Sequence, residues 1–371
     1  MAELPARLAA LEAAGLRRRL TKVQGVDLTS NDVLGLSTHP AIRAALVEAL
    51  ELGTPHGAGA SRLLRGNHPA WEAAEDRFAR WQGTEAALAH ATGFAANSGL
   101  LASLPEPGDV VISDALNHAS LIDGLRLAKA EVVIVPHGDL DAAASALAAR
   151  ASRRAWVVLE SVYSMDGDTP DLVAWAELCA THGARLVVDE AHATGLFGPT
   201  GQGRVVEEDL REGVFATIHT CGKALGLAGA FVCGSRDLVD WLVNRSRPFV
   251  FSTAPPPFLA AGLHAALDLV QATPALRVRP LALGAQLRTA LPGVDTGGST
   301  THIVPVVVGS EARALALQEL LAAAGWDARA IRPPTVPAGT SRLRLVLRAP
   351  LADAQVAAFA ADLLAGLAAL P

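Results

Sequence analysis

The sequence predicts an α/β protein with a mostly parallel central sheet and a smaller α+β domain in its C-terminal part. Short β-rich runs alternate with longer stretches rich in alanine and leucine, and several of these runs are apolar at consecutive positions. Strands that are apolar on both faces, with room for a helix between them, are typical of a parallel sheet covered by helices on both sides. The proline cluster Pro255–Pro257 interrupts this alternation.

Six runs are predicted to form the strands of the large sheet. They are Asp109–Ser113, Glu131–Val135, Trp156–Glu160, Arg185–Asp189, Phe215–His219 and Ala230–Cys233. Most of the intervals between them are long enough for a helix, so crossover connections in a parallel sheet are expected. Ligand sites in such sheets lie just past the carboxyl ends of the strands. The residues that follow each run are therefore the candidate functional residues.

The chain has a different pattern after the proline cluster. Long helical stretches follow it, and then two β-rich runs, 302–308 (HIVPVVV) and 341–347 (SRLRLVL), flank a further helix. This order predicts a small α+β domain. We therefore expect an N-terminal helical segment over residues 1–36, a large α/β domain over 37–268 and a small α+β domain over 269–371.

Composition argues against several classes of function. The 371-residue chain has a net charge of −6 and a pI of about 6.0, which argues against nucleic acid as its main partner. No uncharged apolar run is long enough to predict a membrane span, and the N-terminus lacks a signal pattern. The cysteines are few and widely spaced, as expected for reduced thiols. We therefore expect a cytoplasmic protein with no nucleic-acid and no membrane partner.

Common nucleotide and metal motifs fail in this chain. Lys223 follows Gly222 as in a phosphate-binding loop, but Thr217 stands where that motif needs a glycine. No glycine-rich dinucleotide fingerprint follows a strand, which counts against a hydride-transfer enzyme. Neither a nucleophile elbow nor a His-Glu-x-x-His zinc motif is present, and the histidines are scattered. No metal site is expected.

Lysine is rare in this chain, yet one lysine follows a predicted strand. Three of the 31 basic residues are lysines, and Lys223 lies in the stretch Thr217–Gly226 (TIHTCGKALG). Asp189 ends another predicted strand, so the two side chains can meet in one pocket. A lysine that forms a Schiff base and an aspartate on a pyridinium nitrogen are what pyridoxal 5'-phosphate (PLP) requires. The same residues also allow a plainer interpretation, in which Asp189 pairs with an arginine and Lys223 lies on the surface.

Three further stretches carry polar residues, and two of them follow predicted strands. The stretch His90–Gly99 (HATGFAANSG) is predicted to begin a helix whose N-terminal N–H groups can bind a phosphate. His118 follows one strand, where an imidazole can stack on a flat ring, and Ser164 follows another. Taken alone, each stretch also fits an ordinary helix cap, surface residue or turn.

Together these stretches resemble a known family. The set GFAAN, LNHASL, YSMDGD, VDEAHATG, HTCGKALG and IRPPTVPAGTSRLRL is similar to motifs of the α-oxoamine synthases. The resemblance runs from about Leu16 to the C-terminus. It implies a PLP-dependent transferase of fold type I, with an aspartate-aminotransferase-like architecture.

The resemblance implies a role for each matching residue around PLP. Lys223 would hold the cofactor through an imine, Asp189 would pair with its ring nitrogen, and His192 would contact its phenolic oxygen. The other implied contacts are His118 on the ring face, Gly93, Phe94 and Thr220 at the phosphate, Ser164 beside the ring, and Ser252 with Thr253 at the partner subunit's phosphate site. The implied assembly is a homodimer with shared active sites.

The resemblance also implies a reaction, the decarboxylative condensation of an amino acid with an acyl thioester. Arg332 would bind the amino-acid carboxylate, while Asn31 and Arg17 would line the acyl side. The stretch IRPPTVPAGTSRLRL favours L-alanine and a pimeloyl thioester, carried on CoA or on acyl carrier protein, as in biotin synthesis. Glycine with acetyl-CoA or succinyl-CoA, and L-serine with palmitoyl-CoA, stay open as alternatives. A non-catalytic binding protein of the same fold is a further alternative.

One position departs from the family's pattern, whereas the family's glycine-rich loop is kept. Cys221 occupies a position where aromatic residues are familiar in such enzymes, and we interpret it as tolerated and not catalytic. The glycine-rich stretch 56–71 offers Ser61, Arg62 and His68 as candidate substrate contacts.

Overall fold

The chain divides into two compact units. The computed structural model describes residues 3–20, 22 and 24–370. Unit 1 comprises Met1–Val33, Ser164–Asp168 and Arg279–Pro371, and unit 2 comprises Leu34–Tyr163 and Thr169–Val278. The short segment Ser164–Asp168 therefore belongs with unit 1, although the chain on both sides of it belongs to unit 2.

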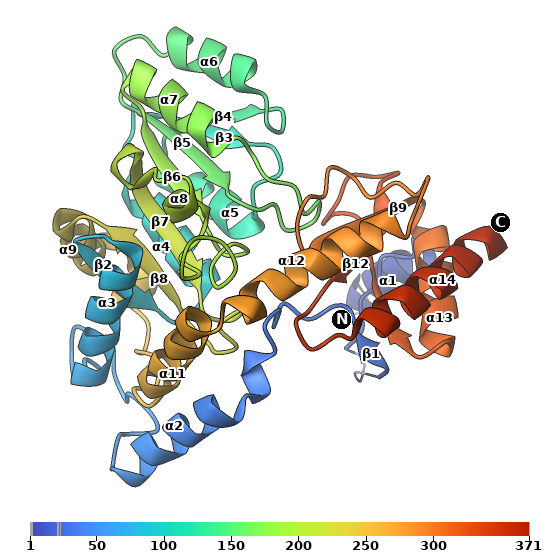
Figure 1. The fold of residues 1–371 in the computed structure, drawn as a ribbon. Coiled ribbons are helices and arrows are strands. Elements are labelled where there is room, and N and C mark those ends of the chain that lie inside the picture. The colour runs from blue at the N-terminus through green and yellow to red at the C-terminus, as the bar shows by residue number, and fades with distance from the viewer. Residues whose placement is uncertain (1–2, 21, 23, 371) are drawn as a thin grey trace. The chain divides into compact units, whose positions relative to one another are not determined.

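Unit 2 contains a sheet of seven described strands (Figure 1). In spatial order they are β2 (Ala86–His90), β8 (Ala230–Gly234), β7 (Val214–Thr220), β6 (Arg185–Asp189), β5 (Ala155–Glu160), β3 (Val110–Asp114) and β4 (Glu131–Val135). The strands from β7 to β4 are parallel, whereas β8 runs antiparallel to both β7 and β2. The predicted mostly parallel sheet is confirmed, with all six predicted strands at or next to their predicted positions.

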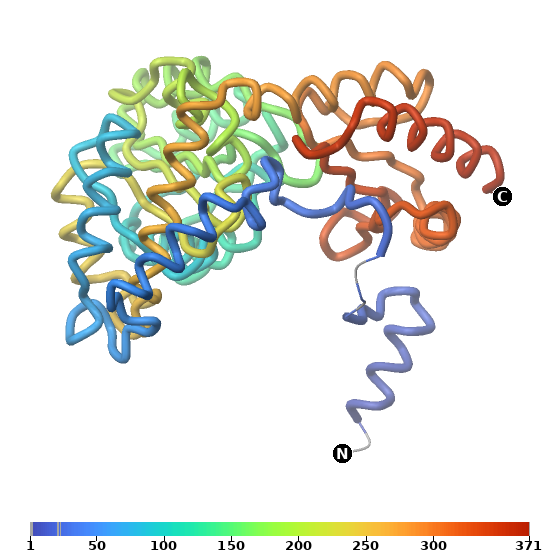
Figure 2. The backbone as a smooth tube through the Cα atoms, turned by 60° about the horizontal axis from the view of Figure 1, so that its bottom comes forward, coloured from blue at the N-terminus to red at the C-terminus, as the bar shows by residue number. Residues whose placement is uncertain are grey.

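Helices make up much of the rest of unit 2. They are η1 (Leu36–Thr38), α2 (Pro40–Glu51), α3 (Pro69–Gln82), α4 (Gly93–Ser103), α5 (Ala119–Ala128), α6 (Leu140–Ala149), α7 (Leu172–His182), α8 (Arg204–Glu207), η2 (Arg211–Gly213), α9 (Arg236–Arg245), α10 (Arg247–Val250) and α11 (Leu259–Ala272). Thr92, Asp139 and Asp171 cap α4, α6 and α7, since each side chain accepts a first-turn N–H. Helix α11 packs against α2 and α3 (Figure 2).

The large sheet is buried on both faces, and alternate residues of a strand pack in different cores. Trp156 and Val158 of β5 lie in a core with residues of α4 and α5. Val157 and Leu159 of the same strand lie in a second core with residues of α6 and α7. This alternation is the period of two that a strand imposes on its side chains. This alternation determines which residues of each strand point toward α4 and α5.

Strand β2 is absent from the predicted strands. Its sequence, Ala86–His90 (AALAH), is rich in alanine, which favours helices over strands. All five residues are buried, and the strand is held by antiparallel pairing with β8. Tertiary pairing therefore overrides local propensity in this segment.

Unit 1 contains a smaller antiparallel sheet. Its described strands, in spatial order, are β11 (Arg329–Ile331), β12 (Ser341–Val346) and β9 (Ile303–Gly309), and a separate parallel pair joins β1 (Val26–Asp27) to β10 (Trp326–Asp327). Its helices are α1 (Glu3–Ala13), α13 (Glu311–Ala323), α14 (Asp353–Ala369) and the later part of α12 (Pro274–Thr289). The two β-rich runs predicted for this part of the chain are present as β9 and β12, with the predicted helix between them. No residue of α1 is buried.

Candidate active site

Three polar residues end neighbouring parallel strands on one face of the large sheet. Glu160 ends β5, Asp189 ends β6 and Thr220 ends β7. In each strand the residue two positions earlier packs in the core shared with α4 and α5. Because side chains two apart point the same way, all three polar side chains point toward that side of the sheet. Glu160 and Asp189 are direct partners in the register of β5 and β6.

Asp189 is buried and hydrogen-bonded through both carboxylate oxygens. Its Oδ2 accepts a hydrogen bond from Nδ2 of Asn97 in α4 at 2.7 Å, and its Oδ1 accepts one from the N–H of Ala191 at 2.8 Å. The Asn97 amide also donates to Oγ of Ser120 in α5 at 2.9 Å. Asn97 lies in a motif that the sequence singled out, but no role was predicted for it. It orients the carboxylate that is predicted to meet a cationic ring nitrogen.

His118 is fixed at the start of α5. Its Nδ1 accepts a hydrogen bond from the N–H of Ser120 at 3.2 Å and lies 2.7 Å from Oγ of the same residue. Burial lowers the pKa of His118; the charge of Asp189 opposes this shift, and the charge of Lys223 adds to it. The imidazole is therefore a neutral, oriented group with its proton on Nε2.

Glu160 is a second buried carboxyl group in this cluster, and sequence reasoning missed it. Its carboxyl accepts a hydrogen bond from the backbone N–H of His118. Burial raises the pKa of Glu160 well above its ordinary value, and the charge of Asp189 raises it further, whereas the charge of Lys223 lowers it. A signal for this residue was present in the sequence, because a glutamate ends the otherwise apolar run WVVLE.

Lys223 lies just after β7, and its charge acts on the same cluster. It lowers the pKa of both His118 and Glu160, so the amine lies close enough to act on the residues at the start of α5 and the end of β5. Nearby, burial raises the pKa of the Cys221 thiol to about 12. That thiol is therefore protonated at neutral pH and is a poor nucleophile, which agrees with its interpretation as non-catalytic.

The turn that carries Lys223 depends on glycine. The N–H of Gly222 donates to Oγ1 of Thr220 at 3.3 Å, and the N–H of Gly226 donates to the carbonyl of Lys223 at 2.9 Å. Gly226 has a φ of 66°, and a Cβ at this position would lie 2.4 Å from the backbone nitrogen of Ser37. A side chain at position 226 would therefore displace the turn that carries the lysine.

Helix α4 begins with N–H groups that are suited to an anion. The Thr92 hydroxyl caps the helix by accepting the N–H of Ala95 at 3.1 Å. The first-turn N–H groups of Gly93 and Phe94 have no intrahelical carbonyl to bind, as at any helix start. A Cβ at Gly93 would lie 3.4 Å from Oγ1 of Thr220, so this helix start lies beside the end of β7. A phosphate there would meet N–H groups and a hydroxyl together.

His192 and the segment around Ser252 complete the predicted residues of unit 2. His192 is buried in the turn that follows Asp189. Ser252 is half-buried and Thr253 is exposed, in a segment whose next residue, Ala254, donates its N–H to the carbonyl of Ala60 at 3.0 Å. This segment is therefore tied to the body of unit 2 while the Thr253 side chain stays exposed.

Ser164 and Asn31 belong to unit 1, where one arginine joins them. Arg344 of β12 donates from Nε to the carbonyl of Ser164 and from Nη2 to Oδ1 of Asn31, the latter at 3.1 Å. Arg344 is buried. Sequence reasoning assigned it no role, although it lies within the diagnostic stretch IRPPTVPAGTSRLRL. The structure therefore brings these two predicted residues together through a third that was missed.

The two arginines predicted to contact substrates also belong to unit 1. Arg17 donates from Nη1 to Oε2 of Glu12 at 3.1 Å, and Arg332 donates to the carbonyl of Gly15. Both therefore bind the residues at the end of α1 and just beyond it.

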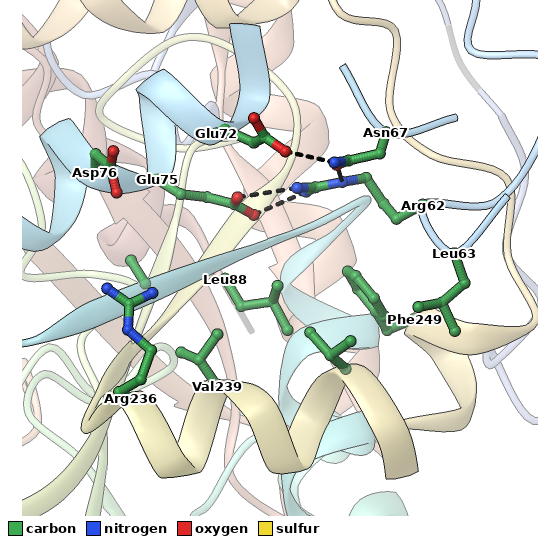
Figure 3. Close-up of a pocket in the computed structure, with 12 residues that line it drawn as sticks. Arg62, Leu63, Asn67, Glu72, Glu75, Asp76, Leu88, Arg236, Val239 and Phe249 are labelled. Atoms are coloured by element: carbon green, nitrogen blue, oxygen red, sulfur yellow. Dashed lines mark hydrogen bonds and ion pairs between the residues drawn. The ribbon is translucent and has the colours of Figure 1, made fainter. Parts of the chain in front are cut away.

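Arg62, a weaker candidate from the sequence, is held in an ion pair beside a separate cavity. Its guanidinium donates to both oxygens of Glu75, at 2.7 and 2.9 Å, and to Asn67 at 2.6 Å (Figure 3). Glu75 also accepts the N–H of Ala89 at 2.8 Å, and His68 caps α3. The cavity measures about 290 Å³, and none of the predicted cofactor residues lines it. These contacts give Arg62 a structural role.

Replacing Arg62 by alanine is expected to lower the free energy of unfolding by about 3 kcal/mol, because it leaves a buried carboxylate without its partner. The side chains of Arg62 and Glu75 are only 8% and 12% exposed. Denaturant unfolding followed by circular dichroism measures the change. The double variant Arg62→Met with Glu75→Leu removes both charges and should recover most of the loss. Arg126→Ala, at an exposed ion pair with Asp123, is the control and is expected to have only a small effect on the free energy of unfolding. An equally small effect of Arg62→Ala would contradict a structural role for the Arg62–Glu75 pair.

Neither a metal cluster nor a membrane segment is found in the described part of the chain. Within residues 3–20, 22 and 24–370, no group of three or more His, Cys, Asp or Glu residues is placed to hold a metal ion. Over the same residues, no helix combines the length and the apolar character needed to cross a bilayer.

Comparison with known families identifies the class that this fold and site define. Residues 23–363 match the family model of aminotransferase class I and II. The chain therefore belongs to the aminotransferase class I and II family. The predicted fold type I architecture, the prediction of an enzyme and the prediction of PLP as cofactor are confirmed by this membership.

Individual relatives show which enzymes this chain is similar to. An 8-amino-7-oxononanoate synthase of Anaeromyxobacter dehalogenans (strain 2CP-1) is 47% identical over 382 residues, which cover 99% of this chain and 96% of the relative. Another, from Geobacter sulfurreducens, is 44% identical over 358 residues, which cover 91% of each chain. A solved serine palmitoyltransferase of S. paucimobilis with bound PLP and myriocin has a TM-score of 0.90 and 28% identity, over 98% of this chain and 96% of that one. The resemblance predicted from the sequence motifs is confirmed, and these relatives are named 8-amino-7-oxononanoate synthase.

Proposed function

We propose that this chain uses PLP, held at Lys223, to condense L-alanine with a pimeloyl thioester. The reaction would give 8-amino-7-oxononanoate, CO2 and free CoA or carrier thiol, a step of biotin synthesis. The support is the identity to relatives of that name over nearly their whole length, together with the cluster of Asp189, His118 and Lys223 in unit 2.

The residues of unit 2 fit PLP. The Asp189 carboxylate is buried, oriented by Asn97 and able to accept a hydrogen bond from a protonated ring nitrogen. The start of α4 offers N–H groups beside the Thr220 hydroxyl for a phosphate. Two buried oxygens in the same cluster, Oδ1 of Asn97 and Oε1 of Glu160, lack a hydrogen-bond partner among the described residues, as expected beside a polar ligand site.

Each residue of the cluster has a distinct task in this proposal. Bound PLP supplies a ring that accepts electrons from the substrate Cα. Asp189 would keep the ring nitrogen protonated, and His118 would cover the ring face and exclude water from it. Lys223 holds the cofactor, and its amine then takes the Cα proton of alanine and later returns it. His192 would bind the phenolic oxygen.

The substrate contacts are assigned to residues of unit 1. Arg332 binds the alanine carboxylate, because a guanidinium forms paired hydrogen bonds with that group. Asn31 and Arg17 would line the acyl side, and Ser164 would be a contact of the ring. Arg344 supports this assignment by holding Asn31 and Ser164 in one hydrogen-bonded group.

The proposed assembly is a homodimer with shared active sites. Ser252 and Thr253 reach the phosphate site of the partner subunit, which the exposure of Thr253 permits. The proposed domain limits are 1–36, 37–268 and 269–371. A cytoplasmic location is proposed because the three cysteines are unpaired, as in a reducing compartment.

Release of products from defined substrates tests this function. The PLP-loaded protein is expected to liberate CO2 and free thiol from L-alanine and pimeloyl-CoA, and to do neither when one substrate is omitted. Glycine with acetyl-CoA is the alternative pair, as for a glycine C-acetyltransferase, and L-serine with palmitoyl-CoA is the pair suggested by the solved serine palmitoyltransferase. Turnover with either of these pairs in place of alanine and pimeloyl-CoA would assign a different reaction to the same site.

A further inference from the structure

Glu160 is a buried titratable group that ends a strand beside Asp189 and has no task in the proposed reaction. The residue is 2% exposed and ends β5, directly opposite Asp189 in the strand register. Its carboxyl accepts the backbone N–H of His118, and its Oε1 has no hydrogen-bond partner among the described residues. Burial of an ionised carboxylate costs much free energy when one of its oxygens has no hydrogen-bond partner. Burial of a protonated carboxyl group costs far less.

We propose that Glu160 carries a proton in the folded enzyme and acts as a neutral positioning residue, which holds His118 over the cofactor while Asp189 remains the charged carboxylate. This inference rests on the proposed function, because it assigns a task to Glu160 at the PLP site. Glu160 does not touch the reacting atoms. It acts through the backbone N–H of His118, which it fixes at the start of α5.

The charged groups around Glu160 favour the protonated form. Asp189 on β6 and Asp114 on β3 both raise its pKa, in addition to burial, which is the largest cause. Lys223, after β7, is the charged neighbour that lowers it. His118, which caps α5, is neutral because burial lowers its pKa. When two carboxyl groups share a buried site, one ionises and the other keeps its proton.

The two carboxyl groups differ in what holds them. Asp189 receives donors on both oxygens, from Asn97 and from Ala191, and these bonds stabilise its negative charge. Glu160 accepts a hydrogen bond from one backbone N–H. The carbonyl oxygen of a neutral carboxyl group accepts such a bond equally well, so this bond does not require a charge on Glu160. The division of charge between the two groups therefore follows from their hydrogen bonds. A neutral Glu160 leaves Asp189 as the counter-charge for the ring nitrogen.

The test compares Glu160→Gln with the unmodified protein. Glutamine is neutral, has nearly the same shape and keeps an oxygen for the His118 N–H. An infrared difference spectrum between the two proteins at neutral pH is expected to contain the C=O band of a protonated carboxylic acid, present only in the unmodified protein. A difference spectrum that contains carboxylate bands instead would overturn the proposal.

A second measurement uses the visible absorbance of the PLP-loaded protein, titrated with pH. If Glu160 is neutral, Glu160→Gln leaves the titration midpoint of the Lys223 imine unchanged. If Glu160 is an anion, its removal destabilises the protonated imine and lowers the midpoint by about one pH unit or more, which would overturn the proposal.

A third variant tests the positioning role itself. Glu160→Leu removes the acceptor for the His118 N–H and is expected to weaken PLP binding about tenfold or more, whereas Glu160→Gln retains the affinity of the unmodified protein. Equal affinity for all three proteins would overturn the positioning role. If no imine absorbance forms in any of them, the proposed function fails, and the infrared comparison still decides the protonation state of Glu160.

Discussion

Replacing Lys223 by alanine is expected to abolish the imine absorbance of the PLP-loaded protein and to lower kcat/KM at least about 10⁴-fold. The loss is large because one amine holds the cofactor and also transfers the Cα proton, and general acid–base catalysis alone contributes up to about 10⁴-fold. Absorbance after PLP addition, together with CO2 release from L-alanine and pimeloyl-CoA, measures both effects.

Lys223→Arg is the informative companion variant. Arginine keeps the positive charge that acts on His118 and Glu160, but it forms no imine and does not return as a neutral base. It should therefore fail as completely as alanine. Lys129→Arg, at the exposed end of α5, is the matched control and is expected to change kcat/KM by less than about twofold. Substantial activity in Lys223→Arg would show that the chain needs only a charge at this position.

Much of the large domain could be predicted because its strands are buried on both faces. Runs such as Trp156–Glu160 and Arg185–Asp189 carry apolar residues at consecutive positions, which identifies them without knowledge of their partners. Once the parallel order is assumed, the residues at strand ends converge on one edge of the sheet. That rule alone predicts that Asp189 and Lys223 belong to one site.

The residues that support the site were harder to predict because their roles depend on tertiary neighbours. Asn97 matters only because α4 places its amide 2.7 Å from Asp189, and no local pattern encodes that distance. Glu160 matters because two strands pair in a particular register. Arg344 matters because it joins Asn31 to Ser164, which lie far apart in the sequence. Each of these contacts needs segments that meet only in the folded chain.

Replacing Asp189 by asparagine is expected to lower kcat/KM about 10³-fold with little change in stability. Removal of one partner from a buried, hydrogen-bonded charge pair costs about 2–5 kcal/mol, and each 1.4 kcal/mol is about tenfold. The fold should persist because asparagine has the same shape, and the Asn97 amide can turn its unpartnered Oδ1 toward the new donor. Kinetics with L-alanine and pimeloyl-CoA, alongside thermal unfolding, separate the two effects.

Asp171→Asn is the matched control for this substitution. Asp171 caps α7 by accepting the N–H of Ala174 at 3.0 Å, and asparagine caps a helix about as well. Asp171→Asn should leave both kcat/KM and the thermal unfolding nearly unchanged. The loss of kcat/KM in Asp189→Asn can then be attributed to the lost charge at the site. If Asp189→Asn kept full activity, the ring nitrogen would not need this carboxylate. Glu160, the other carboxyl at the same edge of the sheet, would then be the candidate for the charged partner, and its proposed neutral state would be wrong.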